Sequence, residues 1–243
     1  MAWAHLSFGN SVHAALRDWF GYERNLRDPM RVADVMSHHW ITAGFRDGDQ
    51  SESWRQRAVA MVSAYVSSLD PAFEPMSSER TLAFKADGFI MQGRIDRIDV
   101  RGDQMAVVDY KTGKSVPTIE DVRGSSALAM YALMVQRALG ATCFEVELHH
   151  VPSGTCVSWT HSEESLNRQL ERVSQIARDI TVAQDTWDAQ GVIDDEVLDE
   201  LFPARPGRLC GFCDYRDECS AGRSTSERKE SWAGLSEPMD QPV

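Results

Sequence analysis

Apolar and polar residues alternate along two short stretches near the middle of the chain, and each stretch predicts a half-buried β-strand. The first stretch reads Gly93-Arg-Ile-Asp-Arg-Ile-Asp-Val, and the second reads Val107-Val-Asp-Tyr-Lys. The residues between them begin Arg101-Gly-Asp-Gln, which is the composition of a turn. We therefore expect the two stretches to form a hairpin.

The same reading gives the other elements. Apolar residues at helical spacing predict three helices before the hairpin, one directly after it and a long one near the end; short alternating runs predict three more strands. The expected helices cover residues 8–22, 30–45, 51–69 and 120–139 and begin again at about 163, and the expected strands cover 80–85, 143–151 and 156–160. This order predicts an α/β (α+β) fold, in which helices flank a central mixed sheet.

Length and composition narrow the class of protein. With 243 residues, 42% of them hydrophobic, the chain can bury a sizeable core. A net charge of −12 argues against a protein that coats DNA nonspecifically, although seven of the acids lie between residues 181 and 200. No apolar run reaches the ~20 residues of a membrane span, and the first residues do not resemble a signal peptide. Five cysteines without a disulfide pattern favour the reducing cytoplasm.

The hairpin carries the most informative side chains. Asp96 lies on its first strand, and Asp109 and Lys111 share one face of its second strand, because side chains two apart on a strand point the same way. Two carboxylates and one ammonium group near one point suit metal-assisted phosphodiester hydrolysis. The alternative is an ordinary solvated strand end.

Three further features add to the hairpin. His13 lies at the edge of the apolar stripe of the first helix, and Tyr131 lies in the helix after the hairpin; each alone has a structural reading. Cys210, Cys213 and Cys219 form a C-x2-C-x5-C cluster, which is typical of a metal or iron–sulfur site. The alternative for the cluster is three unrelated thiols.

In this order the motifs resemble the RecB-like branch of the PD-(D/E)XK nuclease superfamily, which includes stand-alone RecB family exonucleases, AddB-type nuclease domains and CRISPR-associated adaptation nucleases. The resemblance covers about residues 6–219. It implies a restriction-endonuclease-like nuclease domain over residues 1–205 with extra N-terminal helices. We expect a cysteine-rich iron–sulfur-type segment to follow at 206–220, and a disordered tail at 221–243.

The resemblance also implies an activity: a Mg²⁺- or Mn²⁺-dependent DNA exonuclease in repair, recombination or CRISPR-type processing. Its substrates would be single strands or duplex ends, and its partners a helicase or other repair proteins. The metal ligands it implies are His13, Asp96, Asp109 and the carbonyl of Tyr110. In this reading Lys111 acts on the attacking water, and Tyr131 helps to place the scissile strand. The three cysteines match ligands of a 4Fe–4S cluster.

Basic side chains near this site are expected to bind DNA phosphates: Arg94, Arg97, Lys114 and Arg123. Two positions depart from the family pattern. Ala127 stands where the family has Gln, one helical turn before Tyr131. The first cluster cysteine of the family, which lies upstream of the histidine, has no counterpart before His13. These departures leave two alternatives open, a catalytically inactive DNA-binding or scaffold module and an N-terminally shortened version of an active protein.

Overall fold

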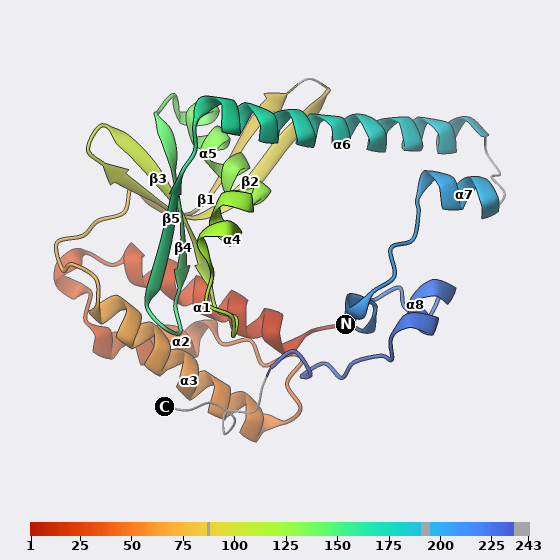
Figure 1. The fold of residues 1–243 in the computed structure, drawn as a ribbon. Helices are drawn as coiled ribbons and strands as arrows, with labels where there is room; N and C mark the ends of the chain where they lie inside the picture. Colours follow the sequence, from red (N-terminus) through yellow and green to blue (C-terminus); the bar gives the residue numbers. More distant parts are fainter. Residues whose placement is uncertain (87, 191–194, 236–243) are drawn as a thin grey trace.

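The structure is a computed structural model that describes residues 1–86, 88–190 and 195–235. Its centre is a five-stranded sheet in the order β1-β2-β3-β4-β5 (Figure 1). The strands are β1 (Ser77–Ala86), β2 (Phe89–Arg101), β3 (Gln104–Lys111), β4 (Cys143–His150) and β5 (Thr155–Thr160). The expected hairpin is β2 and β3.

The sheet is mixed, as expected. Neighbouring strands are antiparallel except for β3 and β4, which are parallel. Parallel neighbours need a crossover, and here two helices supply it. They are α4 (Ile119–Gly124) and α5 (Ser126–Leu139).

Helices cover both faces of the sheet (Figure 1). One face carries α1 (Ala4–Gly21), α2 (Val32–His39) and α3 (Gly48–Ser67), with two short 3-10 turns at Arg24–Leu26 and Pro29–Arg31. The other face carries α4, α5 and the start of α6 (Glu163–Gln190). The chain then continues through α7 (Asp195–Leu201), a 3-10 turn at Arg208–Phe212 and α8 (Ser220–Thr225).

The strand alternation divides the core into two parts. Val108 and Tyr110 point from β3 to α1–α3, where they join Leu16 and Trp54 in one apolar cluster. Val107 points the other way, into the cluster beneath α5 and α6. Residues i and i+2 of a strand share a face, so β3 presents one set of side chains to each helical layer.

Three elements differ from the expectations. The helix expected at 120–139 is interrupted at Ser125, whose hydroxyl accepts a hydrogen bond from the Leu128 N–H and so begins α5 as a new helix. The helix expected to reach residue 45 ends at His39. The expected tail contains α8 and backbone hydrogen bonds up to Leu235, while its last residues, 236–243, lie outside the described part.

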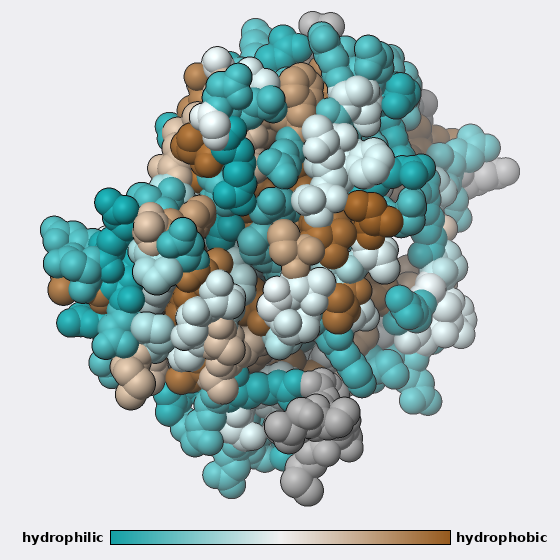
Figure 2. All heavy atoms as spheres, turned by 60° about the vertical axis from the view of Figure 1, so that its left-hand side comes forward, coloured by the Kyte–Doolittle hydropathy of each residue, from teal (hydrophilic) through white to brown (hydrophobic). Residues whose placement is uncertain are grey.

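The surface in Figure 2 carries small apolar patches between polar side chains, without one continuous apolar face. None of the helices in the described part of the chain has the length and hydrophobicity that a membrane crossing requires.

Candidate active site

The candidate site lies where β2 and β3 separate. Their ladder begins at Arg101 and Gln104 and ends at the pair of Arg97 and Val108. Asp96 is the next residue of β2, and its Oδ2 accepts a hydrogen bond of 2.8 Å from the backbone N–H of Tyr110. The Asp96 side chain thus accepts the Tyr110 N–H in place of a backbone carbonyl of β2. This hydrogen bond fixes the carboxylate at the opening between the two strands.

His13 reaches this opening from α1. Its Nδ1 lies 3.1 Å from Asp96 Oδ1, and its ring meets the Tyr110 ring edge-on. Burial lowers the pKa of His13, but hydrogen bonds with Asp96 and Glu79 and the charges of Asp96 and Asp109 outweigh burial and raise that pKa to about 10. In the absence of a metal, this imidazole is therefore held as a cation among carboxylates.

Glu79 completes the acidic group, and sequence reasoning missed it. Its neighbours Ser78 and Arg80 pair with Arg97 and Ile95 of β2, so Glu79 faces Asp96 across the two strands. Its backbone φ is +50°, a conformation that few non-glycine residues adopt and that is found at functional sites. The carboxylate is 6% exposed, with one oxygen 3.7 Å from His13 Nδ1.

Asp109 and Lys111 extend from β3 toward the same opening. Lys111 Nζ lies 2.7 Å from Asp109 Oδ2, and the lysine side chain is half-exposed. Burial raises the pKa of Asp109 and the charge of Asp96 raises it further, whereas Lys111 and His13 lower it. The predicted convergence of Asp96, Asp109 and Lys111 is therefore present.

Tyr131 lies across the site on α5. A Cβ atom added to Gly93 would lie 2.7 Å from Tyr131 Cε1, so only glycine at this position of β2 lets the ring pack there. Burial raises the pKa of the Tyr131 hydroxyl, and the charges of Asp109 and Asp96 raise it as well. The tyrosine is therefore within electrostatic reach of both acids.

The donor atoms suit a hard divalent cation. One imidazole nitrogen and carboxylate oxygens from His13, Glu79 and Asp96 all lie within 4.8 Å of one another. Asp109 is close enough to interact with them electrostatically, because its charge raises the pKa of His13 and the charge of Asp96 raises the pKa of Asp109. Carboxylate oxygens favour Mg²⁺ or Mn²⁺ over softer metals, so these residues fit the expected ion. The Tyr110 carbonyl stays a predicted ligand.

Three of the four basic residues expected to bind DNA lie at the surface. Arg94 is 62% exposed and its Nε lies 2.6 Å from Glu79 Oε2. Lys114 is exposed after β3, and Arg123 on α4 packs its guanidinium over the Trp159 ring.

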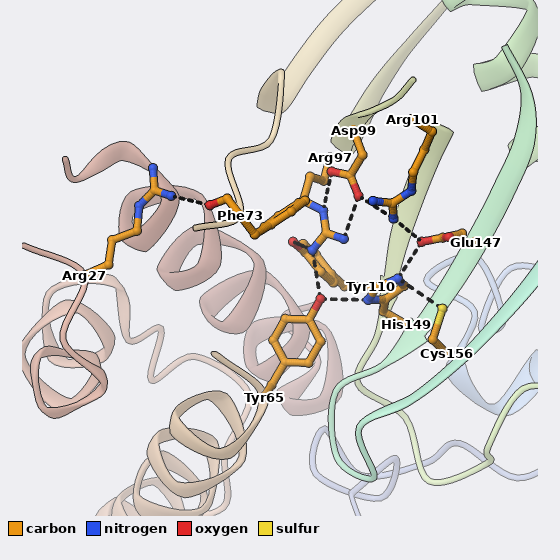
Figure 3. Close-up of polar contacts among 10 residues, drawn as sticks. All are labelled: Arg27, Tyr65, Phe73, Arg97, Asp99, Arg101, Tyr110, Glu147, His149 and Cys156. Atoms are coloured by element: carbon orange, nitrogen blue, oxygen red, sulfur yellow. Dashed lines mark hydrogen bonds and ion pairs between the residues drawn. The ribbon is translucent and has the colours of Figure 1, made fainter. Parts of the chain in front are cut away.

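Arg97 does not fit the expectation of a phosphate contact, because its guanidinium is buried on the α1–α3 side of the sheet (Figure 3). Two of its nitrogens donate to both oxygens of Asp99, at 2.8 and 3.0 Å. A third donates to the hydroxyls of Tyr65 and Tyr110. Arg97 is therefore a structural cation of the core.

A groove of about 790 Å³ opens beside the site. His13 lies in its wall together with Thr112, Gly113 and Lys114 from the loop after β3. Arg57 of α3 contributes a second cation to the wall, and its guanidinium lies over the Trp54 ring. The groove therefore places His13 near two basic side chains, the exposed Lys114 and the partly buried Arg57.

The three C-terminal cysteines lie together in one turn-rich segment. The Cys219 thiol accepts a hydrogen bond from the Gly222 N–H, and Cys210 and Cys219 both lie near the position that a Cβ atom on Gly222 would take. Cys213 is exposed. A 4Fe–4S cube takes four thiolates, and the two remaining cysteines of the chain belong to the sheet. The described residues therefore offer three cysteines for the expected cluster, and the cluster itself stays a prediction.

One comparison with known proteins agrees with this arrangement. Residues 2–220 match the sequence model of the PD-(D/E)XK nuclease superfamily. No curated protein matches the chain closely enough to count as a relative.

Proposed function

We propose that this chain, which belongs to the PD-(D/E)XK nuclease superfamily, is a DNA exonuclease of the RecB-like kind that depends on Mg²⁺ or Mn²⁺. The family itself implies a nuclease that uses divalent metal ions. The exonuclease mode, the identity of the metal and the DNA substrate are the proposed parts.

One observation carries the proposal. Four side chains from α1, β1, β2 and β3 meet at the opening between β2 and β3, namely His13, Glu79, Asp96 and Asp109. A cation would serve there as a Lewis acid and would lower the pKa of an attacking water. Carboxylate oxygens and an imidazole nitrogen close together are the donor set that a divalent cation takes, and this supports a metal site.

The protein groups have separate roles in this proposal. Asp96 is held rigid by the Tyr110 N–H, and so it fixes the position of the site. Lys111 is half-exposed at the edge of the site, where its ammonium group would orient the nucleophile and stabilise charge that develops on the phosphate. Tyr131 would contact the strand from the α5 side.

The groove supports a nucleic acid substrate. Lys114 and Arg57 line its wall next to His13, and cations along such a groove contact the phosphates of a strand. Because the whole chain has a net charge of −12, binding would depend on this local concentration of positive charge. A helicase or another repair protein would supply further DNA contacts.

Cleavage of end-labelled DNA tests the proposal. Linear single-stranded and duplex substrates, and a closed circular single strand, are incubated with the protein in Mg²⁺ or Mn²⁺. We expect the linear substrates to be degraded and the circle to persist. Asp109→Ala and Lys111→Ala are expected to lower kcat by about 10²-fold or more, as for the loss of a preorganised charge.

Asp103→Ala and Lys85→Ala are matched controls, because both side chains are exposed; Asp103 lies in the turn between β2 and β3, and Lys85 lies near the end of β1. Absence of cleavage above the Asp109→Ala background on every substrate would favour the inactive DNA-binding module. Cleavage of the circle would replace the exonuclease with an endonuclease.

A further inference from the structure

A second group of metal-type ligands lies on the α1–α3 side of the sheet, at the end of the network around Arg97 (Figure 3). It consists of Glu147, His149 and Cys156, whose donor atoms all lie within 4.8 Å of one another. His149 Nε2 is 2.8 Å from Glu147 Oε2 and 3.3 Å from the Cys156 thiol. The nuclease site uses none of these residues.

The strand register brings the three side chains together. Glu147 and His149 are two apart on β4 and therefore share a face. Cys156 pairs with His149 across the antiparallel β4–β5 ladder, which places the thiol beside the imidazole. The arrangement is thus fixed by regular backbone, as a preorganised site requires.

Tyr65 of α3 fixes the orientation of the imidazole. Its hydroxyl lies 2.8 Å from His149 Nδ1, so Nε2 is the nitrogen that faces the carboxylate and the thiol. The same hydroxyl accepts a hydrogen bond from Arg97 and can accept another from an Nδ1–H. A hydrogen-bonded partner on the remaining ring nitrogen is the usual support of a metal-binding histidine.

Other roles fit this geometry less well. In a nucleophilic triad the carboxylate and the thiol contact different ring nitrogens, whereas here both contact Nε2. In a simple hydrogen-bonded cluster, Nε2 carries at most one proton, which the Glu147 carboxylate accepts, and the Cys156 thiol is only a weak hydrogen-bonding partner.

We propose that Glu147, His149 and Cys156 form a Zn²⁺ site. The carboxylate and the thiolate together balance the charge of the ion, and binding releases the thiol proton to solvent. Oxygen, nitrogen and sulfur ligands favour Zn²⁺ over Mg²⁺, unlike the donors between β2 and β3. Cys156 is exposed, so solvent completes the coordination, and the ion joins the edge strand β5 to β4.

Arg101 is the cation that competes with such an ion. Its Nη2 lies 3.5 Å from Glu147 Oε2, and its side chain is 39% exposed. The same nitrogen donates to Asp99 Oδ2 at 3.1 Å, so Arg101 keeps a partner when the metal takes Glu147. Arg101→Ala is expected to tighten metal binding, because it removes a positive charge beside the carboxylate.

Cobalt titration of the chelator-treated chain in excess Mg²⁺ tests the site. Co²⁺ replaces Zn²⁺ and reports thiolate ligands by charge-transfer absorption. We expect Cys156→Ser to lose this absorption for one cobalt per chain, while Cys143→Ala keeps it. The three C-terminal cysteines are present in every sample, so any absorption from them cancels in the difference between variants.

Tyr65→Phe is the second variant. It removes the hydroxyl beside His149 Nδ1 and is expected to weaken binding about 10- to 100-fold, as for other supporting partners of metal ligands. Equal cobalt stoichiometry and equal spectra for the unchanged protein and Cys156→Ser would overturn the proposal. The cobalt titrations do not involve DNA cleavage, so their result is independent of the proposed nuclease activity.

Discussion

Glu79 Oε1 lies 3.7 Å from His13 Nδ1, although one side chain comes from an edge strand and the other from the first helix. The contact depends on the left-handed backbone at Glu79, whose φ is +50°. A residue held in such a conformation is a candidate for function. Glu79 therefore belongs with the acids of the β2–β3 opening.

Glu79→Gln is expected to weaken Mn²⁺ binding and cleavage about 10- to 100-fold, the range found when a residue that supports a metal site is lost. The amide keeps the shape of the side chain and removes only its charge. Manganese titration followed by steady-state cleavage measures both effects. Glu120→Gln removes an exposed charge on α4 and should change neither; equal results for the two variants would exclude Glu79 from the site.

The pKa of His13 gives a prediction of pH dependence. Because this pKa is raised from 6.5 to about 10, the metal-free protein binds a proton that a metal must displace. Apparent Mn²⁺ affinity should therefore increase with pH by up to about tenfold per pH unit below 10. Without metal, the protonated His13 stabilises the fold fully below pH 6.5, and this contribution is lost as pH rises through about 10.

Calorimetry of Mn²⁺ binding in two buffers with different ionisation enthalpies measures the displaced proton. His13→Gln provides the comparison, because it cannot hold the proton. If the unchanged protein and this variant release the same number of protons, the imidazole is not coupled to the metal.

Gly93→Ala should disturb the packing of α5 on β2. The new Cβ would lie 2.7 Å from Tyr131 Cε1 and 3.1 Å from Met134 Cε. Overpacking of this kind costs about 1–3 kcal/mol of unfolding free energy, measured by urea denaturation. Gly48→Ala, which meets no atom within 4 Å, is the control. The double variant Gly93→Ala with Tyr131→Leu should lose less unfolding free energy than the sum of the two single variants. A loss equal to that sum would show that the two residues do not interact.

Ala127→Gln is expected to raise activity or DNA affinity. Ala127 is exposed on α5 one turn before Tyr131, where a longer polar side chain can reach toward the site. Gln costs little helix propensity relative to Ala. Ala138→Gln, exposed near the other end of α5, is the matched change. If Ala127→Gln leaves the cleavage kinetics on single- and double-stranded DNA unchanged, the alanine at position 127 does not lower the activity.

The C-terminal cysteines are expected to hold iron–sulfur weakly or incompletely, because the described residues supply three thiolates where a 4Fe–4S cube takes four. Anaerobic purification followed by iron and sulfide assays measures the content. Cys213→Ser should reduce it further, while Cys143→Ala should leave it unchanged. Four irons per chain that persist in air would contradict this ligand count.

The sequence predicted the parts of the site that depend on local pattern. Asp109 and Lys111 could be placed on one face because strand alternation has a fixed period, and the turn at Arg101 located the hairpin. Tyr131 could be assigned to the site only through the resemblance to the nuclease family, since a tyrosine on the apolar face of a helix is equally consistent with a core residue. The packing of its ring on Gly93 became visible only when α5 lay over β2.

The errors came from contacts between distant segments. Glu79 reads as a polar residue of an edge strand until its backbone conformation turns it toward His13. The position of Arg97 next to Asp96 predicts a DNA contact, but Arg97 and Asp99 are two apart on one strand face, and they form an internal ion pair.

Two segments from near opposite ends of the described chain meet at the start of α1. The Ala4 N–H donates to the Ser231 carbonyl at 2.9 Å, and Trp3 packs edge-on against Phe212 within the cysteine segment. His13 lies on the same helix, roughly 14 Å along its axis from Ala4. The contacts that hold the cysteine segment therefore also anchor the start of the helix that carries His13.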